Sequence, residues 1–470
     1  ASRMSARIAI LHYHLRPGGV TRVIANTLRQ WGDAGDRVVT LSGEAPGGAW
    51  PGPVRVAPEL GYGLGADRSV AERLMGECRA ALGGAPDLIW IHNHNLGKNP
   101  ALTGAVARWA AEGQRLLLQI HDFAEDGRPD RYEALRRWRS DPATWLYPAG
   151  PGVHYALLNR RDAEVIRAAG ADPRQVHVLP NPIEVRDPFP DDRADPAFRV
   201  YPVRPIRRKN IGELLFRAAG PGGCRYAITL GPTRVGGAAE GYDRFCALAR
   251  ELDLPVEFEA GLRPGCSYEA LLARAGGVIT TSLAEGFGLV FLESWMAGRS
   301  LEGRDLPEIT ADFKAAGVVL DGLYERWPVA ADLYDVAAFR RRWREAFAES
   351  RRRYGRPVES AEAIDGGGSA AGEVDFGELD ETAQIEAIGR VRREPGRWMA
   401  PPVAPGGPDC RAANRRAIME AFGPSAFRSR LRAMLTACLT DEARPSRSVL
   451  NGERILDFFL EPTRFRMLRT

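Results

Sequence analysis

The chain has 470 residues, of which 44% are hydrophobic and 26% are charged, and its 64 Lys and Arg against 60 Asp and Glu give a net charge of +4. A chain of this length exceeds what one hydrophobic core normally holds, so we expect two or three compact units. The charge is spread along the chain, and no basic run is interleaved with aromatic residues. These features argue against a nucleic-acid-binding protein.

The cysteines are scattered, without a C-x-x-C pair or the spacing of a metal site, which predicts reduced thiols in a cytoplasmic protein. They are Cys78, Cys224, Cys246, Cys266, Cys410 and Cys438. The segment from Ala1 to Arg7 lacks the apolar stretch of a signal peptide, and no run reaches about 18 apolar residues. We therefore expect no transmembrane segment, and any contact with a membrane would be peripheral.

Short apolar runs alternate with helical patterns through the first 190 residues. The expected strands are Arg7–His12, Arg37–Leu41, Asp87–His92, Arg115–His121 and Val176–Leu179. The expected helices are Val20–Trp31, Ser69–Leu82, Ala101–Ala111 and Arg161–Ala169. Strands separated by helices form parallel βαβ units, so the sequence predicts a doubly wound α/β domain over residues 1–190.

The same pattern restarts after an acidic, Pro-rich linker at Asp187–Asp195 and fades after about Leu320. Its expected strands are Phe198–Val203, Tyr226–Leu230, Val256–Ala260 and Gly277–Thr281, with helices at Asn210–Ala219 and Tyr242–Leu252. We predict a second α/β domain over residues 198–325. Residues 326–470 are predicted to form a helix-rich region with a flexible loop near 361–373.

The segment GGVITTSLAEGFGLVFLESWMAG, from Gly276 to Gly298, carries the most specific motif. A buried strand ends at Glu285, a glycine-containing loop follows, and a helix then carries Glu293. The amides at the start of that helix favour an anion. They belong to Gly288, Leu289 and Val290. The alternative is a charged helix start with a solvated glutamate.

The two glutamates and their spacing resemble the E-x7-E motif of family 4 retaining glycosyltransferases. The resemblance implies a GT-B fold, in which two Rossmann-like doubly wound domains face each other, here with an additional helical C-terminal region. It implies that the second domain binds a nucleoside diphosphate sugar and that the first selects the acceptor. Glu285 would act on the donor sugar as a catalytic residue, and Glu293 would bind the nucleotide ribose. Gly286, Phe287 and the three amides named above would complete the donor site.

Arg204 and Lys209 follow the first strand of the second domain. Two cations at a strand end, just before a helix, suit a diphosphate and stabilise a departing nucleotide. Only three lysines occur in a chain rich in arginine, so each lysine hints at a need for a compact ammonium group. The pair resembles the Arg and Lys with which the family binds the donor diphosphate, although Val203 stands where the family has glycine. The alternative is a solvated basic loop.

The first domain carries two further motifs at strand ends. Gly18-Gly19-Val20 lacks the G-x-G-x-x-G pattern of dinucleotide-binding enzymes, which argues against an NAD enzyme. It resembles the GGV-type loop of the family, whose amides face the donor. His121 ends the strand RLLLQIH, where α/β sheets place ligand-binding groups. It resembles a catalytic histidine of the family near the donor sugar.

Polar residues also follow the strand that ends at His92. Asn93, His94, Asn95 and Lys98 precede a helix that Asn99 would cap, with Pro100 at its first position. A helix start beside a lysine favours an anion, so we predict that these four residues bind an acceptor bearing a phosphate or carboxylate. The alternative is a well-capped turn. Two histidines without a third ligand argue against a metal site here.

The segment GRSLEGRDL before Pro307 departs from the family, which has a longer stretch with an apolar strand there. We therefore expect the edge of the second sheet to differ.

Together these features predict a retaining hexosyltransferase that moves a sugar from a nucleoside diphosphate to a small, anionic acceptor in an interdomain cleft. Arg204 and Lys209 would balance the charge on the leaving group, so no metal ion or other cofactor is expected, and no nucleic acid partner. The base, the sugar and the acceptor stay open. A GT-B nucleotide-sugar epimerase and a non-catalytic nucleotide-sugar-binding protein remain alternatives, and an oxidoreductase is disfavoured by the missing glycine pattern.

Overall fold

The computed structural model describes residues 5–32, 35–63, 69–233, 238–358, 373–403 and 409–469. The chain divides into two compact units. The first unit consists of Ala1–Glu184 and Phe422–Glu461, and the second of Val185–Ala421 and Pro462–Thr470. The loop predicted near 361–373 lies outside the described residues except for Glu373. Among the described helices, none has the length and apolar character needed to span a bilayer.

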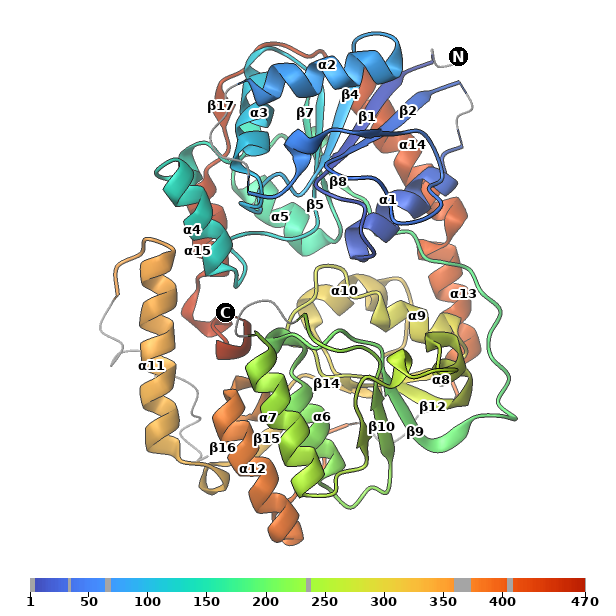
Figure 1. The fold of residues 1–470 in the computed structure, drawn as a ribbon, viewed down its shortest axis with the longest axis vertical. Coiled ribbons are helices and arrows are strands. Elements are labelled where there is room, and N and C mark those ends of the chain that lie inside the picture. Colours follow the sequence, from blue (N-terminus) through green and yellow to red (C-terminus); the bar gives the residue numbers. More distant parts are fainter. Residues whose placement is uncertain are drawn as a thin grey trace. The chain divides into compact units, whose positions relative to one another are not determined.

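The first unit is built on a parallel sheet with the strand order β3-β2-β1-β4-β5-β7-β8 (Figure 1). Its strands are β1 (Arg7–His12), β2 (Arg37–Ser42), β3 (Val54–Val56), β4 (Leu88–His92), β5 (Leu116–Ile120), β7 (Val153–Leu157) and β8 (Val176–Val178). Its helices are α1 (Gly19–Arg29), α2 (Val70–Leu82), α3 (Pro100–Ala111), α4 (Pro129–Trp138), α5 (Arg160–Ala168), α14 (Pro424–Thr440) and α15 (Gly452–Phe459). A short antiparallel ribbon joins β6 (Pro148–Ala149) to β17 (Ser448–Val449).

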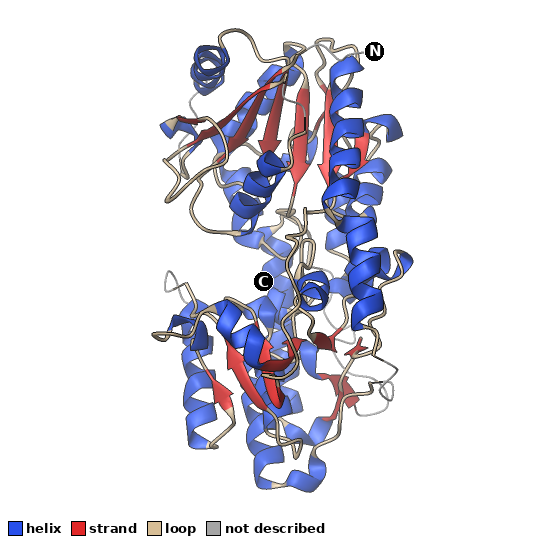
Figure 2. Cartoon of the chain, turned by 90° about the vertical axis from the view of Figure 1, so that its right-hand side faces the viewer, coloured by secondary structure: helices blue, strands red, loops and turns tan. Residues whose placement is uncertain are grey.

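Helices cover both faces of this sheet (Figure 2), which explains why β4, β5 and β7 are buried at every residue. On one face, Ile24 of α1 packs in a cluster with Trp90 of β4 and with a row of apolar residues from α14. That row consists of Phe427, Leu431, Met434, Leu435 and Cys438. A segment from the far end of the sequence therefore completes the core of the first unit.

The second unit repeats the design with the parallel strand order β11-β10-β9-β12-β13-β14. Its strands are β9 (Asp195–Tyr201), β10 (Arg225–Ile228), β11 (Val256–Glu257), β12 (Ala275–Thr280), β13 (Ser300–Arg304) and β14 (Leu323–Tyr324), with an antiparallel ribbon of β15 (Pro328–Ala330) and β16 (Glu373–Asp375). Its helices are α6 (Ile211–Ala218), α7 (Ala238–Glu251), α8 (Tyr268–Arg274), α9 (Val290–Met296), α10 (Pro307–Ala315), α11 (Val336–Arg353), α12 (Glu381–Arg393) and α13 (Arg411–Phe422). Two parallel α/β units of this kind confirm the predicted fold class.

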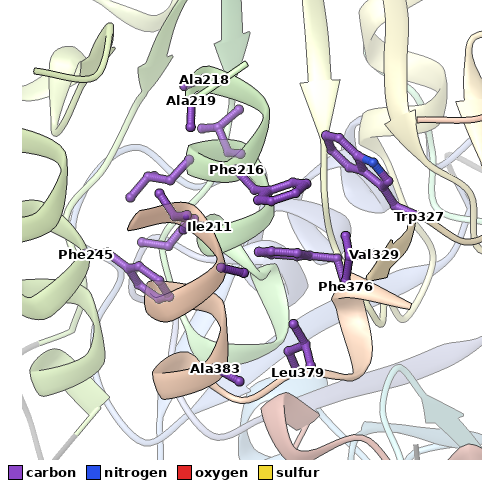
Figure 3. Packing of buried hydrophobic residues seen from close by; sticks show 14 of the residues in the cluster. Ile211, Phe216, Ala218, Ala219, Phe245, Trp327, Val329, Phe376, Leu379 and Ala383 are labelled. Atoms are coloured by element: carbon purple, nitrogen blue, oxygen red, sulfur yellow. The ribbon is translucent and has the colours of Figure 1, made fainter. Parts of the chain in front are cut away.

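Residues 326–470, which the sequence groups as one helix-rich region, are divided between the units. The part that stays with the second unit supplies its core: Phe216 of α6 packs against Phe376 at a ring distance of 4.5 Å and against Trp327 at 5.0 Å (Figure 3). Leu379 and residues of α12 extend the same cluster. The sheet of the second unit is thus covered on one face by residues that follow it in sequence.

The polar segment before Pro307, where an altered sheet edge is expected, forms β13 and pairs in parallel with β12 and β14. The charged residue Glu302 of this strand pairs with arginines of neighbouring elements. Glu302 accepts from Arg199 Nε at 3.0 Å, and its carboxylate lies 3.4 Å from the guanidinium of Arg217. The sequence looked too polar for a buried strand only because the partners of these charges are distant in the chain.

Arg304, at the end of β13, is the centre of a buried charge network. Its guanidinium donates to both carboxylate oxygens of Glu213, at 2.6–3.1 Å, and to both of Asp375, at 2.9 Å. Tyr324 donates a further hydrogen bond to Glu213. All three charged side chains are at most 4% exposed. The network joins α6, β13 and β16 through groups that water does not reach.

Replacing Arg304 by Met should lower the free energy of unfolding of the second unit by about 3–5 kcal/mol, because two buried carboxylates lose their counter-charge. The measurement is denaturant unfolding followed by the fluorescence of the tryptophans. Arg225→Met is the control, since Arg225 pairs with Asp195 on the surface, where an ion pair contributes about 1 kcal/mol or less. Equal losses in the two variants would contradict the importance of the network.

Candidate functional site

In the second unit, β9 and β12 are neighbours in the sheet although β10 and β11 come between them in sequence. In open parallel sheets, ligands bind beyond the carboxyl ends of two strands at such a switch in strand order. The loop after β9 carries Arg204 and Lys209, and the loop after β12 carries Glu285. The topology thus brings the two strongest predicted motifs to one edge of the sheet.

Lys209 and Glu285 form an ion pair between these two loops. Their side chains are only 16% and 13% exposed, so the pair is largely shielded from water. The backbone of Lys209 is held by both strands: its carbonyl accepts from the hydroxyl of Tyr201 at 2.8 Å and from that of Thr281 at 3.1 Å. The ammonium group is therefore fixed beside the carboxylate.

Glu285 is ionised despite its burial. Burial alone raises the pKa of its carboxyl group, but the charges of Lys209 and Arg208 and the hydrogen bond from Lys209 outweigh burial and hold that pKa below its usual value. Arg208 also ties the loops together, since its carbonyl accepts from the amide of Leu283 at 2.8 Å. The site therefore carries two cations and one carboxylate at close range.

The start of α9 offers backbone donors beside this pair. Within the described part of the chain, the amides of Gly288, Leu289 and Val290 have no hydrogen-bond partner, whereas the amide of Phe291 donates to the carbonyl of Gly288 at 3.0 Å. Gly288 has a φ of +82°, and a Cβ atom there would lie 2.7 Å from the ring of Phe291. Glycine is thus needed for the turn that presents these amides.

The other residues predicted for the donor side differ in burial and in their contacts. Phe287 is buried and packs edge-on against Phe313 at 5.4 Å, which anchors the loop. Gly286 is half-buried, and Glu293 is half-buried in the first turn of α9. Arg204 is exposed and donates to the carbonyl of Gly231 at 3.2 Å. Val203, which replaces the glycine of the family, is buried in the core, so the change fills the interior.

In the first unit, Gly18 and Gly19 are exposed at the start of α1, with Val20 half-buried. Neither glycine adopts the left-handed conformation, and a Cβ atom at Gly19 would meet nothing within 4 Å. Packing therefore does not require glycine at this turn. Two residues without side chains leave the helix start sterically open, and the binding role of Gly18, Gly19 and Val20 stays a prediction.

His121 is joined to a second histidine at the carboxyl ends of β4 and β5. Its Nε2 lies 2.8 Å from Nδ1 of His92, and its amide donates to the side chain of Asn93 at 2.7 Å. Burial lowers the pKa of His121 to about 4 and that of His92 well below its usual value, so both rings are neutral near pH 7. His121 can exchange hydrogen bonds with a ligand but cannot supply charge.

Of the residues predicted to bind an acceptor, only Lys98 is open to solvent. Asn93, His94 and Asn95 are buried, and their side chains serve internal contacts. His94 Nε2 lies 3.1 Å from the carbonyl of Leu146, and Asn95 donates to the carbonyl of Asp122 at 3.1 Å. These three residues shape the turn from inside.

Lys98 lies at the start of α3, as predicted. Asn99 caps that helix by accepting from the amide of Leu102 at 2.9 Å. The Lys98 ammonium is 3.2 Å from the hydroxyl of Tyr62 and 5.9 Å from the ring centre of Tyr13. Burial, followed by the charge of Arg131, lowers the pKa of Lys98.

Several charged or titratable side chains near Lys98 are not among the residues predicted from the sequence. Arg131 and Arg128 of the segment around α4 lie near enough to affect its charge, and Asp122, which opposes them, is paired with Arg128 at 2.5 Å. His12 is buried at the end of β1, and its Nδ1 has no hydrogen-bond partner. The sequence offered one signal for His12, namely its position at a strand end. This edge of the first unit is therefore mainly cationic.

Glu125 is a further buried acid of this unit. It is 1% exposed, and burial raises its pKa to about 7, although Tyr147 donates to both of its oxygens at 2.9 and 3.0 Å. Tyr147 in turn lies 3.5 Å from the amide nitrogen of Asn95. A hydrogen-bonded chain thus runs from this acid to the turn that carries Lys98.

Comparisons with known proteins agree with this geometry. Residues 17–187 match Glycosyltransferase Family 4. The chain is 26% identical over 372 residues to mannosylglucosyl-3-phosphoglycerate synthase of Petrotoga mobilis, a match that covers 72% of each chain. The chain is a glycosyltransferase with the GT-B fold, and its residues 17–187 are similar to family 4. The alternatives of an epimerase or a non-catalytic binding protein are not favoured.

Solved structures show the same fold at low sequence identity. Anabaena Alr3699/HepE in complex with UDP-glucose superposes with a TM-score of 0.54 at 13% identity, over 92% of this chain and 99% of the other. Sucrose-phosphate synthase of Thermosynechococcus elongatus superposes with a TM-score of 0.53 at 14% identity, over 92% and 98%. These likenesses confirm the GT-B fold of this glycosyltransferase.

Proposed function

We propose that this glycosyltransferase moves a hexose from a nucleoside diphosphate sugar to a hydroxyl group of a phosphate-bearing acceptor, with retention of anomeric configuration and without a metal ion. The observation that carries the proposal is the shielded Lys209–Glu285 pair beside the unpartnered amides of α9. One relative binds UDP-glucose, and another is named for a phosphoglycerate product.

On the donor side, the diphosphate lies against Lys209, Arg204 and the amides at the start of α9. An ammonium group has three donor hydrogens, so Lys209 can keep its bond to Glu285 while it donates to a phosphate oxygen. Negative charge grows on the diphosphate as the bond to the sugar breaks, and fixed donors in a shielded site stabilise that charge strongly. Glu285 contacts the sugar, and Glu293 contacts the ribose.

In this proposal the acceptor hydroxyl attacks the anomeric carbon on the face that the diphosphate leaves. The bond from that carbon to the diphosphate breaks, the bond to the acceptor oxygen forms, and the hydroxyl proton passes to the departing diphosphate. Retention then requires no enzyme nucleophile. Glu285 is suited to positioning rather than to attack, because its carboxylate is already bound by Lys209.

On the acceptor side, the cationic edge around Lys98 suits a phosphate or carboxylate. Lys98, Arg131 and Arg128 together outnumber the one carboxylate, Asp122, that acts on Lys98. A phosphate near a partly buried ammonium group gains a charge-assisted hydrogen bond. The phosphoglycerate group in the name of the Petrotoga mobilis relative has this chemistry. We therefore assign a phosphoglycerate glycoside as the acceptor class.

The diphosphate assignment predicts the effect of Lys209→Met. A charge-assisted hydrogen bond contributes roughly 1.5–3 kcal/mol, so affinity for a nucleoside diphosphate should fall by about tenfold or more, with a smaller loss for the monophosphate. Isothermal titration calorimetry with UDP, GDP and ADP, and with their monophosphates, measures this. Arg225→Met, at the opposite edge of the sheet, should bind like the wild type.

A second variant separates the lost contact from the buried charge that Lys209→Met leaves on Glu285. In Lys209→Met/Glu285→Gln that charge is absent, and the loss of diphosphate affinity should remain. Recovery of wild-type affinity in the double variant, or equal losses for diphosphate and monophosphate, would contradict the assignment.

The acceptor assignment predicts a rise of about tenfold in acceptor KM for Lys98→Met, with unchanged donor affinity, because methionine keeps an apolar side chain and removes the charge. The assay compares glucosyl-3-phosphoglycerate with its dephosphorylated form in both enzymes. The variant should lose most of the preference for the phosphorylated acceptor. An unchanged preference would show that Lys98 does not bind the phosphate.

The proposed chemistry predicts that transfer continues in excess EDTA and that the product keeps the anomeric configuration of the donor. Proton NMR of the anomeric signal reports the configuration, and initial rates with and without EDTA report the metal requirement. Inversion would overturn the reaction course. Loss of activity in EDTA that Mg²⁺ or Mn²⁺ restores would overturn metal independence.

A further inference from the structure

A second cluster of reactive side chains lies in the first unit, at the opposite edge of the sheet from Lys98 and His121. His154 is the second residue of β7, His177 is the second residue of β8, and Cys438 lies in the last turn of α14. Each offers one nitrogen or sulfur atom, and these three atoms lie within 4.8 Å of one another. In the part of the chain that the structure describes, no other group of three or more His, Cys, Asp or Glu meets this condition.

The imidazole rings of His154 and His177 each direct one nitrogen atom toward the other ring. Nδ1 of His154 lies 2.9 Å from Nε2 of His177, and the ring planes differ by only 7°. With both rings neutral, one nitrogen of this contact holds a hydrogen and the other accepts it. The distance is slightly below the separation of roughly 3.3 Å expected for two nitrogens at about 2.0–2.1 Å from one tetrahedral zinc ion. A small opening of the contact would therefore admit a cation.

Asp441 sets which nitrogen of His154 carries the hydrogen. Its Oδ2 lies 3.1 Å from His154 Nε2 and accepts from the amide of Gly152 and the side chain of Gln175, each at 2.8 Å. The carboxylate therefore accepts a hydrogen from Nε2, which leaves the lone pair of Nδ1 facing the cluster.

A carboxylate that binds the remote nitrogen of a histidine is the usual outer partner of a histidine that binds a metal. Cys438 is fully buried and has no disulfide partner. When a cation binds, the thiol proton of Cys438 passes to solvent, and the hydrogen on His177 Nε2 is replaced by one on Nδ1 of the same ring, so that both rings stay neutral.

We propose that His154 Nδ1, His177 Nε2 and Cys438 Sγ form a binding site for a divalent d-block cation of the zinc type, oriented by Asp441. Two nitrogens and one sulfur suit zinc and its neighbours, whereas Mg²⁺ and Ca²⁺ prefer oxygen. The fourth position of a tetrahedral ion is filled by water or by Asp441 after a shift of its side chain.

The position of the site indicates a structural role. The ligands come from β7, β8 and α14, so a bound ion joins the late helix to the sheet formed by the early part of the chain. The site lies at the amino ends of the strands, and the groups assigned to sugar transfer lie at the carboxyl ends of theirs. The proposal therefore does not depend on the proposed function.

Metal titration of the full chain tests the site. After dialysis against EDTA, the wild type should bind one equivalent of Zn²⁺ by calorimetry, and Zn²⁺ should raise its Tm, because an ion that binds only the folded state stabilises it. With Co²⁺ as the probe, a thiolate-to-cobalt charge-transfer band should appear in the near ultraviolet. Absence of stoichiometric Zn²⁺ binding, or of this band, would overturn the proposal.

Substitutions locate the binding. Cys438→Ser and His177→Ala should each abolish the stoichiometric binding and the Tm shift, and Asp441→Asn should weaken the binding by about 10–100-fold. Cys78→Ser is the matched control, because Cys78 is the other buried cysteine of this unit, and this variant should bind like the wild type. His177 is only half-buried and lies outside the core cluster, so its variant keeps the test valid if Cys438→Ser fails to fold. Unchanged binding in His177→Ala would overturn the site.

Discussion

Both large sheets are parallel and carry helices on their faces, so their central strands are largely removed from water. Polar side chains in such a sheet are tolerated only at strand ends or where a partner neutralises them within the protein. The carboxyl ends of β9 and β12 follow the first rule, and Lys209 meets Glu285 there. Strand β13 follows the second, because Arg304 and Glu302 are matched by acids and bases from other elements. The position of the Lys209–Glu285 pair at strand ends and the paired charges of β13 both follow from the burial of strands in a covered parallel sheet.

The donor-side groups gain their character from proximity to one another. Burial raises the pKa of the Glu285 carboxyl, but the charges of Lys209 and Arg208 outweigh this effect, so the carboxylate stays ionised near neutral pH. On the first unit the histidines show the opposite outcome. Burial lowers the pKa of His92 and of His121, although the charge of Asp122 opposes this effect at His121, and both rings remain neutral. The two units therefore present different kinds of polar surface, one with fixed ions and the other with neutral imidazoles beside the cationic edge around Lys98.

Local patterns in the sequence were sufficient for the βαβ units, for the helix start at Asn99 and for the motif around Glu285. They failed where a residue depends on a distant partner. The partners of Arg304, Glu213 and Asp375, are distant in the sequence, so local patterns do not predict that the polar segment of β13 forms a buried strand. Asn93, His94 and Asn95 looked like ligand-binding groups because a strand end normally exposes such residues, but the turn folds their side chains inward. Spacing along the chain likewise gave no sign that Cys438 meets two histidines, since that meeting is produced by α14 packing on the sheet.

The packing of α14 also bears on how the protein is made. The strands of the first unit leave the ribosome early, but the cluster that covers one face of them includes Phe427, Leu431 and Met434, which are synthesised hundreds of residues later. Until then, that face of the sheet must stay exposed, be covered by other segments, or be shielded by a chaperone. The nascent chain thus passes through a long interval in which the strands of the first unit are made but α14 is not, and the rate of translation through the second unit sets how long that interval lasts.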